Sequence, residues 1–158
     1  KLYTVDDLET TLHAMQDKID TLKKSASSKQ ARIKEVDELL RMVDYYKSGK
    51  PAADKLKSIR FEKSRQKYES EHDNELRTFY MAERKLKPYF KDGKLPITAW
   101  RKERAQLEQE YRDIQSELSP LHADAKKLWA IHYNIYEGQH EQERQNTELR
   151  QKKQEMER

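Results

Sequence analysis

The sequence predicts an all-α protein, an elongated antiparallel three-helix bundle of coiled-coil type with a protruding polar C-terminal tail. Two observations favour this class. The 158 residues include only 3 Gly and 4 Pro, and 39% of them are charged while 34% are hydrophobic. Such a composition suits long helices with narrow apolar stripes. In addition, apolar residues recur at steps of three and four along most of the chain, without the alternation that strands require.

The first predicted helix covers residues 5–47. Thr4 is placed to cap it, and acidic residues follow in the first turn, where they meet the positive end of the helix dipole. Eleven positions then form a heptad seam, ten of them apolar. They are Leu8, Leu12, Met15, Ile19, Leu22, Ala26, Lys29, Ile33, Val36, Leu40 and Val43. The exception, Lys29, either fixes the register or marks a bend; we favour a bend, because it lies in a serine-rich run.

The second predicted helix covers residues 52–90 and has an aromatic-rich seam. The run KSGKP before it is expected to end the first helix, with Gly49 after the last turn and Pro51 opening the next helix. The seam positions are Tyr68, His72, Leu76, Phe79, Leu86 and Phe90. Pro88 is expected to loosen the last turn. The run KDGKLP that follows predicts a second turn.

The third predicted helix covers residues 97–136, with a kink expected at Pro120. Its seam positions are Trp100, Arg104, Leu107, Tyr111, Ile114, Leu118, Leu121, Ala125, Leu128, His132 and Ile135. Three aromatic residues beside the seam are expected to be core, because aromatics at helical spacing usually pack; they are Trp129, Tyr133 and Tyr136. Residues 137–158 form a polar tail, either a solvated helical extension or disordered.

The three helices are of nearly equal length, and short turns join them. Each is roughly 60 Å long at ~1.5 Å per residue. Equal lengths favour one antiparallel bundle over residues 1–136, followed by the tail. The alternative is a hairpin of the second and third helices, with the first helix pairing elsewhere or in a homodimer through the coiled coil.

The pattern of residues predicts no catalytic centre, no metal site and no cofactor. Glu69 with His72 and Glu137 with His140 have the spacing of helix-bundle di-iron ligands, but the second pair lies in the polar tail. We therefore expect His72 to be a packing residue. No segment approaches the ~18–20 apolar residues of a membrane span, so no membrane partner is expected. The absence of cysteine fits a cytoplasmic protein.

The formal net charge is +4, and the basic excess lies in the middle of the chain. Residues 48–96 carry 13 basic and 8 acidic residues. Two clusters at helical spacing are the candidate nucleic-acid contacts: Lys57, Arg60, Lys63 and Lys67, and then Arg84, Lys87, Lys91 and Lys94. On one straight helix they fall on opposite flanks of the seam and make two patches. A solvated charged face is the alternative interpretation.

Three stretches resemble the C-terminal helical region of relaxase/mobilisation nucleases of bacterial conjugative or mobilisable elements. They are YESEHDNELRTFYMAERKLKPYF, KLPITAWRKERAQLEQEYRDI and AKKLWAIHYNI, within roughly residues 41–135. Matching places are held by Tyr68, His72, Leu76, Tyr80, Leu86, Pro96, Glu103, Leu107, Tyr111 and Arg112. The acidic, glutamine-rich end after Glu137 departs from the basic tail that is usual in that family.

The resemblance implies a parent protein that nicks DNA at a transfer origin through a separate N-terminal nuclease domain. That domain carries a tyrosine nucleophile and a His-hydrophobe-His metal site, and no residue here takes either role. What the resemblance implies for this chain is an accessory function in the bacterial cytoplasm. The expected partners are transfer-origin DNA and other relaxosome or transfer proteins. The alternative is a structural coiled-coil scaffold or dimerisation module without nucleic-acid binding.

Overall fold

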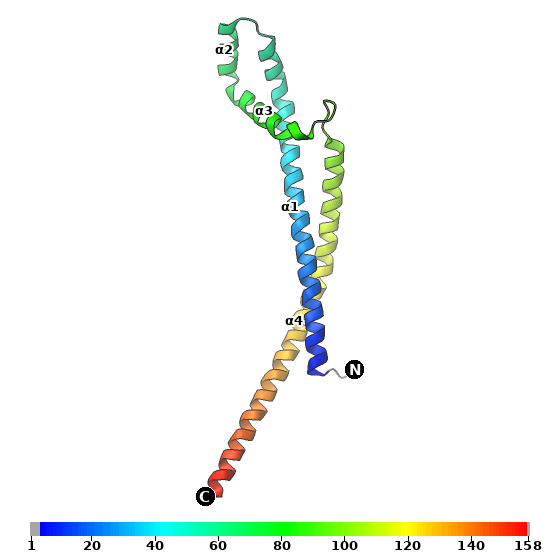
Figure 1. The fold of residues 1–158 in the computed structure, drawn as a ribbon, viewed down its shortest axis with the longest axis vertical. Helices are drawn as coiled ribbons and strands as arrows, with labels where there is room; N and C mark the ends of the chain where they lie inside the picture. The colour runs from blue at the N-terminus through cyan, green and yellow to red at the C-terminus, as the bar shows by residue number, and fades with distance from the viewer. Residues whose placement is uncertain (1–3, 158) are drawn as a thin grey trace. The chain divides into compact units, whose positions relative to one another are not determined.

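The structure is a computed structural model that describes residues 4–157. Over these residues the chain forms four α-helices, one 3₁₀ helix and no β-strand (Figure 1). The elements are α1 (Val5–Ser58), α2 (Glu62–Glu71), α3 (Asp73–Leu86), η1 (Lys87–Tyr89) and α4 (Ile97–Met156). The predicted all-α class is confirmed. The chain divides into two compact units. Unit 1 combines the first part of α1, up to Ala26, with α4 from Arg112 onward, and unit 2 is Ser27–Tyr111.

Unit 1 is an antiparallel coiled coil of α1 and α4. Its buried residues are Leu8, Leu12, Ile19 and Ala26 from α1, and Ile114, Leu118 and Ala125 from α4. All seven are predicted seam positions. Two cross-helix contacts give the direction, because Lys18 pairs with Glu117 at 3.4 Å and Glu9 with His132 at 3.1 Å. Residue numbers in α4 rise as the numbers of their partners in α1 fall, so the two helices run in opposite directions.

The start of α1 is closed by reciprocal hydrogen bonds. The backbone N–H of Asp7 donates to Oγ1 of Thr4 at 3.1 Å, and the N–H of Thr4 donates to Oδ2 of Asp7 at 3.2 Å. Two N–H groups that lack helical acceptors are satisfied in this way. The predicted cap at Thr4 is confirmed.

Unit 2 has a core to which α1, α3 and α4 contribute. One cluster contains Val36, Leu39, Met42, Val43, Ala82, Leu86 and Trp100. A second contains Ala52, Ala53, Leu76 and Phe79. Tyr46 packs against both, with its ring centroid 5.0 Å from that of Phe79 and 5.6 Å from that of Phe90. The aromatic seam predicted in the second helix therefore lies against α1, as expected.

The predicted end of the first helix near Gly49 is wrong, because α1 continues to Ser58. Gly49 is buried, and a Cβ atom built on it would lie 2.6 Å from Cβ of Phe79. This glycine serves the close approach of α1 and α3 rather than a turn. Pro51 lies inside α1, where it removes one helical hydrogen bond. Burial of Ala52 and Ala53 against α3 offsets that loss.

The predicted helix over 52–90 is divided between the end of α1, α2, α3 and η1. A three-residue connector, 59–61, lets α2 return beside the last turns of α1 (Figure 1). The chain then bends at His72, which has φ −116° and ψ 25°. Three helices of equal length therefore do not form. The last turn loosens into η1 at Pro88, as predicted.

The second predicted turn is confirmed, because backbone hydrogen bonds of 2.9 and 3.0 Å link Lys91 and Lys94. Asp92 and Gly93 between them have positive φ angles of 52° and 73°. From Ile97 the helix α4 continues through Pro120 to Met156 without a restart. The polar tail is thus helical as far as Met156. Every side chain from 136 to 157 is exposed, since no part of α1 covers this length of α4.

Candidate nucleic-acid interface

The connector between α1 and α2 is a short, well-bonded loop. The N–H of Ile59 donates to the Leu56 carbonyl at 3.3 Å, and the Arg65 guanidinium donates to the Ile59 carbonyl at 3.1 Å. The Phe61 carbonyl accepts the first bond of α2 from the N–H of Arg65, at 2.9 Å. Phe61 itself has an extended backbone, with φ −82° and ψ 128°. Arg65 therefore holds both sides of the connector together.

The segment around this connector is rich in positive charge. Residues 47–67 include eight basic and only two acidic residues. Four of the basic residues lie at or beside the connector, and we call them the basic tip: Lys57, Arg60, Lys63 and Lys67. All four side chains are exposed. Within residues 4–157, none of them has a salt bridge or side-chain hydrogen bond. The first predicted cluster thus presents four free cations.

Three further cations of the same segment have partners within the protein, and one of them is Lys50, whose Nζ lies 5.8 Å from the ring centroid of Tyr46. Arg65 holds the connector, and the Nζ of Lys55 lies 5.3 Å from the ring centroid of Tyr68. That ring stacks on His72 with centroids 4.0 Å apart, and Nδ1 of His72 lies 3.0 Å from the Tyr68 carbonyl oxygen. His72 is therefore a packing residue at the bend between α2 and α3. These contacts fix α2 against α1 and leave the basic tip to solvent.

Three cations between α1 and α4 in unit 2 differ from the basic tip, because each of them has a carboxylate across the interface; they are Lys29, Arg32 and Arg104. Arg32 donates from Nε and Nη2 to Glu103 at 2.6 and 3.1 Å. These hydrogen bonds raise the pKa of the Arg32 guanidinium and lower the pKa of Glu103. Lys29 donates to Glu110 at 2.7 Å, and this hydrogen bond lowers the pKa of Glu110.

Arg104 completes this set. It occupies a predicted seam position and pairs with Asp37 on α1, and that hydrogen bond raises the pKa of Arg104. The seam lysine at position 29 is also accounted for by its pairing with Glu110, and α1 is an uninterrupted helix there. This ion pair explains how a lysine can remain half-buried at a seam position.

The second predicted cluster lies around the 91–94 turn. Arg84 is near the end of α3, Lys87 begins η1, and Lys91 and Lys94 flank the turn. All four side chains are exposed. The expectation that the two clusters lie on opposite flanks of the seam assumed one straight helix. The chain bends at His72, so that assumption does not hold. The two clusters instead belong to different elements, one at the α1–α2 connector and one beyond α3.

Phe61 is one of the few apolar residues in the early part of the predicted second helix. In the structure its side chain is 79% exposed. It sits between Arg60 and Lys63 of the basic tip, at the position just before α2. Its spacing of seven residues from Tyr68 places it on the seam face of a continuous helix, so the one signal that could have identified it is the run of polar and charged residues from 62 to 67 that follows it.

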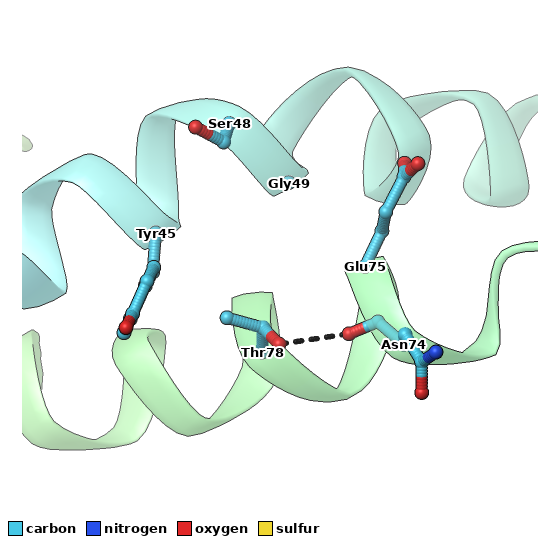
Figure 2. Close-up of a pocket in the computed structure, with 6 residues that line it drawn as sticks. All are labelled: Tyr45, Ser48, Gly49, Asn74, Glu75 and Thr78. Carbon is cyan, nitrogen blue, oxygen red and sulfur yellow. Dashed lines mark hydrogen bonds between the residues drawn. The ribbon is translucent and has the colours of Figure 1, made fainter.

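A groove lies between α1 and α3 in unit 2, with a volume of about 390 Å³. Figure 2 shows its lining: Tyr45, Ser48 and Gly49 from α1, and Asn74, Glu75 and Thr78 from α3. The Thr78 hydroxyl donates to the Asn74 carbonyl at 2.8 Å. Glu75 is the only ionisable carboxylate of the lining, and no histidine or cysteine stands beside it. The groove lies where Gly49 allows the close approach of α1 and α3.

The aromatic residues predicted as core in the third helix are exposed. Trp129, Tyr133 and Tyr136 have exposed fractions of 46%, 61% and 52%. A single helix, α1, packs on this part of α4, and one partner covers only the narrow seam. Side chains one position away from the seam therefore remain in solvent. This expectation assumed a third helix that unit 1 does not have.

Metal binding and membrane insertion each require a particular arrangement of side chains along residues 4–157. No group of three or more histidine, cysteine or carboxylate side chains in that part of the chain is arranged to hold a metal ion. The helices described contain no stretch of the length and hydropathy needed to cross a bilayer.

Comparisons with protein family models, with curated proteins and with solved structures find no match to this chain.

Proposed function

We propose that this chain is a non-catalytic helical module that binds nucleic acid through the basic tip. In its finer form the proposal is an accessory module of a relaxase or mobilisation protein. There it would contact transfer-origin DNA and other relaxosome proteins in the bacterial cytoplasm. The observation that supports nucleic-acid binding is the set of four exposed cations without carboxylate partners, on a connector that Arg65 holds in place.

Phosphate binding is the chemistry that suits such a surface. Lysine and arginine neutralise phosphates as point charges and release condensed counterions, so affinity falls linearly with the logarithm of the salt concentration. Four contacts on duplex DNA correspond to a slope of about −3.6. Affinity should then fall about 150-fold between ~50 and ~200 mM salt. An intramolecular role is poorly suited, since ion pairs within the fold use other cations.

The experiment compares two variants with equal loss of charge. In the tip variant, Lys57, Arg60, Lys63 and Lys67 are all changed to Gln. In the matched control, four exposed lysines outside residues 47–67 and outside the polar tail are changed to Gln instead: Lys23, Lys24, Lys126 and Lys127. Fluorescence anisotropy with labelled oligonucleotides gives affinity at several salt concentrations. We expect the tip variant to lose binding and most of the salt slope, while the control keeps both.

The proposal fails if the parent chain does not bind at ~50 mM salt, or if both variants lose affinity equally. Circular dichroism checks that both remain helical, which we expect because all eight side chains are exposed. The second cluster is tested in the same way, with Arg84, Lys87, Lys91 and Lys94 changed to Gln. If it contributes phosphate contacts of its own, the salt slope falls independently of the basic tip.

A second candidate function is a coiled-coil dimerisation module, and the tail of α4 favours it. The seam spacing of α4 continues beyond Ile135 through Gln139, Gln142, Asn146, Leu149, Lys153 and Met156. Leu149 is 64% exposed and Met156 83%. A second copy of the same segment would cover this seam. In heptad terms Asn146 occupies position a, which in parallel dimers fixes the register.

Charges beside the tail seam favour a parallel pair over an antiparallel one. In a parallel dimer Lys152 at position g faces Glu157 at position e of the other copy. In an antiparallel dimer Glu143 would face Glu157, and Arg150 would face Arg150. Light scattering across a concentration series tests this candidate, because Leu149→Lys with Met156→Lys should give monomers. A parent chain that is monomeric at all concentrations would exclude it.

A further inference from the structure

We propose that Phe61 stacks on an unpaired nucleobase, so that the basic tip selects single-stranded nucleic acid over intact duplex. The inference rests on the nucleic-acid binding proposed above and adds the form of nucleic acid that is bound. It starts from the position of Phe61 on the connector, between two cations of the basic tip and with 79% of its side chain exposed.

Phe61 makes no contribution to either core of unit 2. The apolar residues that surround the nearer cluster are Tyr46, Leu56 and Tyr68, and Phe61 is not among them. Within residues 4–157 it also has no aromatic partner, whereas Tyr68 stacks on His72. Isolated apolar residues at the surface are common, so exposure alone decides nothing. The charged surroundings of this ring and the rigidity of its connector carry the inference.

The backbone under the ring is held on both sides. Arg65 donates from its side chain to the Ile59 carbonyl at 3.1 Å and from its backbone to the Phe61 carbonyl at 2.9 Å. A phenylalanine side chain has only two rotatable angles. When a base binds to this ring, little conformational freedom of the backbone or side chain is lost. The small entropic cost favours affinity.

Stacking and phosphate contact together are the usual means of binding single strands. A positively charged surface follows the backbone while aromatic rings accept successive bases, at a gain of about 5- to 150-fold in affinity for each base. Lys57, Arg60, Lys63 and Lys67 supply the charge around the one ring. In intact duplex the base faces are covered by their neighbours, so Phe61 would gain nothing there unless a step were opened.

A basic surface with an exposed phenylalanine is also found in proteins that bind anionic lipid. Such binding requires an apolar helix face that enters the interface. From Glu62 to Lys67 α2 presents only charged and polar side chains, and Ile59 is half-buried. One ring without apolar neighbours suits a base better than a bilayer.

The test compares substitutions of Phe61 on a labelled oligothymidine of about 20 nucleotides and on a duplex of the same length. We expect Phe61→Ala to lower affinity for the single strand about 5- to 150-fold and to leave duplex affinity and the salt slope unchanged. Phe61→Leu separates stacking from general apolar contact, because it keeps an apolar side chain but loses the ring. It should behave like Phe61→Ala, and Phe61→Tyr should bind like the parent chain.

The outcomes distinguish base stacking by Phe61 from the proposed nucleic-acid binding by the basic tip. If Phe61→Ala binds single strands as tightly as the parent while the tip variant loses binding, stacking is wrong and nucleic-acid binding stands. If the parent binds neither oligonucleotide, both are wrong. Vesicles of phosphatidylcholine and phosphatidylserine provide the last arm. Binding to them that depends on Phe61, without oligonucleotide binding, would overturn the inference in favour of a lipid surface.

Discussion

Replacing Gly49 with alanine places a methyl group where α1 and α3 touch. The new Cβ would lie 2.6 Å from Cβ of Phe79 and 3.0 Å from the backbone oxygen of Glu75. Carbon atoms pack best at about 3.5–4.0 Å, so the first contact is about 1 Å too short. Both partners are fixed to the backbone of α3, and neither can rotate away. The two helices must therefore separate.

The expected magnitude follows from two opposing effects. Alanine favours the helix over glycine by about 1 kcal/mol. Overpacking of a close contact costs about 1–3 kcal/mol, and a clash with backbone-linked atoms belongs in the upper part of that range. We therefore expect Gly49→Ala to lower the free energy of unfolding by about 1–2 kcal/mol. Separation would also loosen the packing of Leu76 and Phe79 against α1.

Gly138 provides the matched control. It lies within α4, and a Cβ built on it meets no atom within 4 Å. Only the helix preference applies there, so Gly138→Ala should stabilise α4 by up to about 1 kcal/mol. Urea unfolding followed by circular dichroism measures both variants, and hydrogen exchange of the α3 amides locates the effect. A Gly49→Ala variant as stable as the parent would refute the close packing of α1 and α3.

Two further predictions concern α1 and its pairing with α4. Pro51→Ala should raise the midpoint temperature of thermal unfolding, because it restores an N–H group that can donate to the Lys47 carbonyl inside α1. A lower midpoint would instead indicate that a separate helix begins at Pro51. Glu103→Gln should lower the free energy of unfolding at pH 7 by less than about 1 kcal/mol, since the pair with Arg32 is partly exposed. Arg32 lowers the folded-state pKa of Glu103 below its ordinary value of 4.5. The pair therefore stabilises the fold above that pH, and its contribution is lost as the pH falls through the lowered value. The difference between variant and parent should vanish in acid, and urea midpoints across the pH range test this.

Heptad periodicity was sufficient to predict the seams of both long helices. All eleven predicted positions of the first helix are buried or half-buried, and so are all eleven of the third. Periodicity succeeds here because α1 and α4 bury one narrow stripe each along their common length. The basic tip could be predicted in composition, since the excess of lysine and arginine is local. Its freedom from ion pairs could not.

The helix ends in the middle of the chain depended on tertiary contacts. Gly49 and Pro51 favour a turn locally, but packing of α3 on this part of α1 stabilises the continued helix, and the glycine is what allows the close approach. The chain turns ten residues later, at the connector. That shift leaves Phe61 and the four cations of the basic tip in solvent.

The sequence alone therefore determined the helical class, the seams, the cap at Thr4 and the place of the basic excess. These properties follow from local spacing, which a helix of 3.6 residues per turn converts directly into a buried face. Only the tertiary structure decided where α1 ends, how many helices cover α4, and which cations and rings remain free. Each of these depends on a partner that is distant in sequence, and local spacing carries no information about that partner.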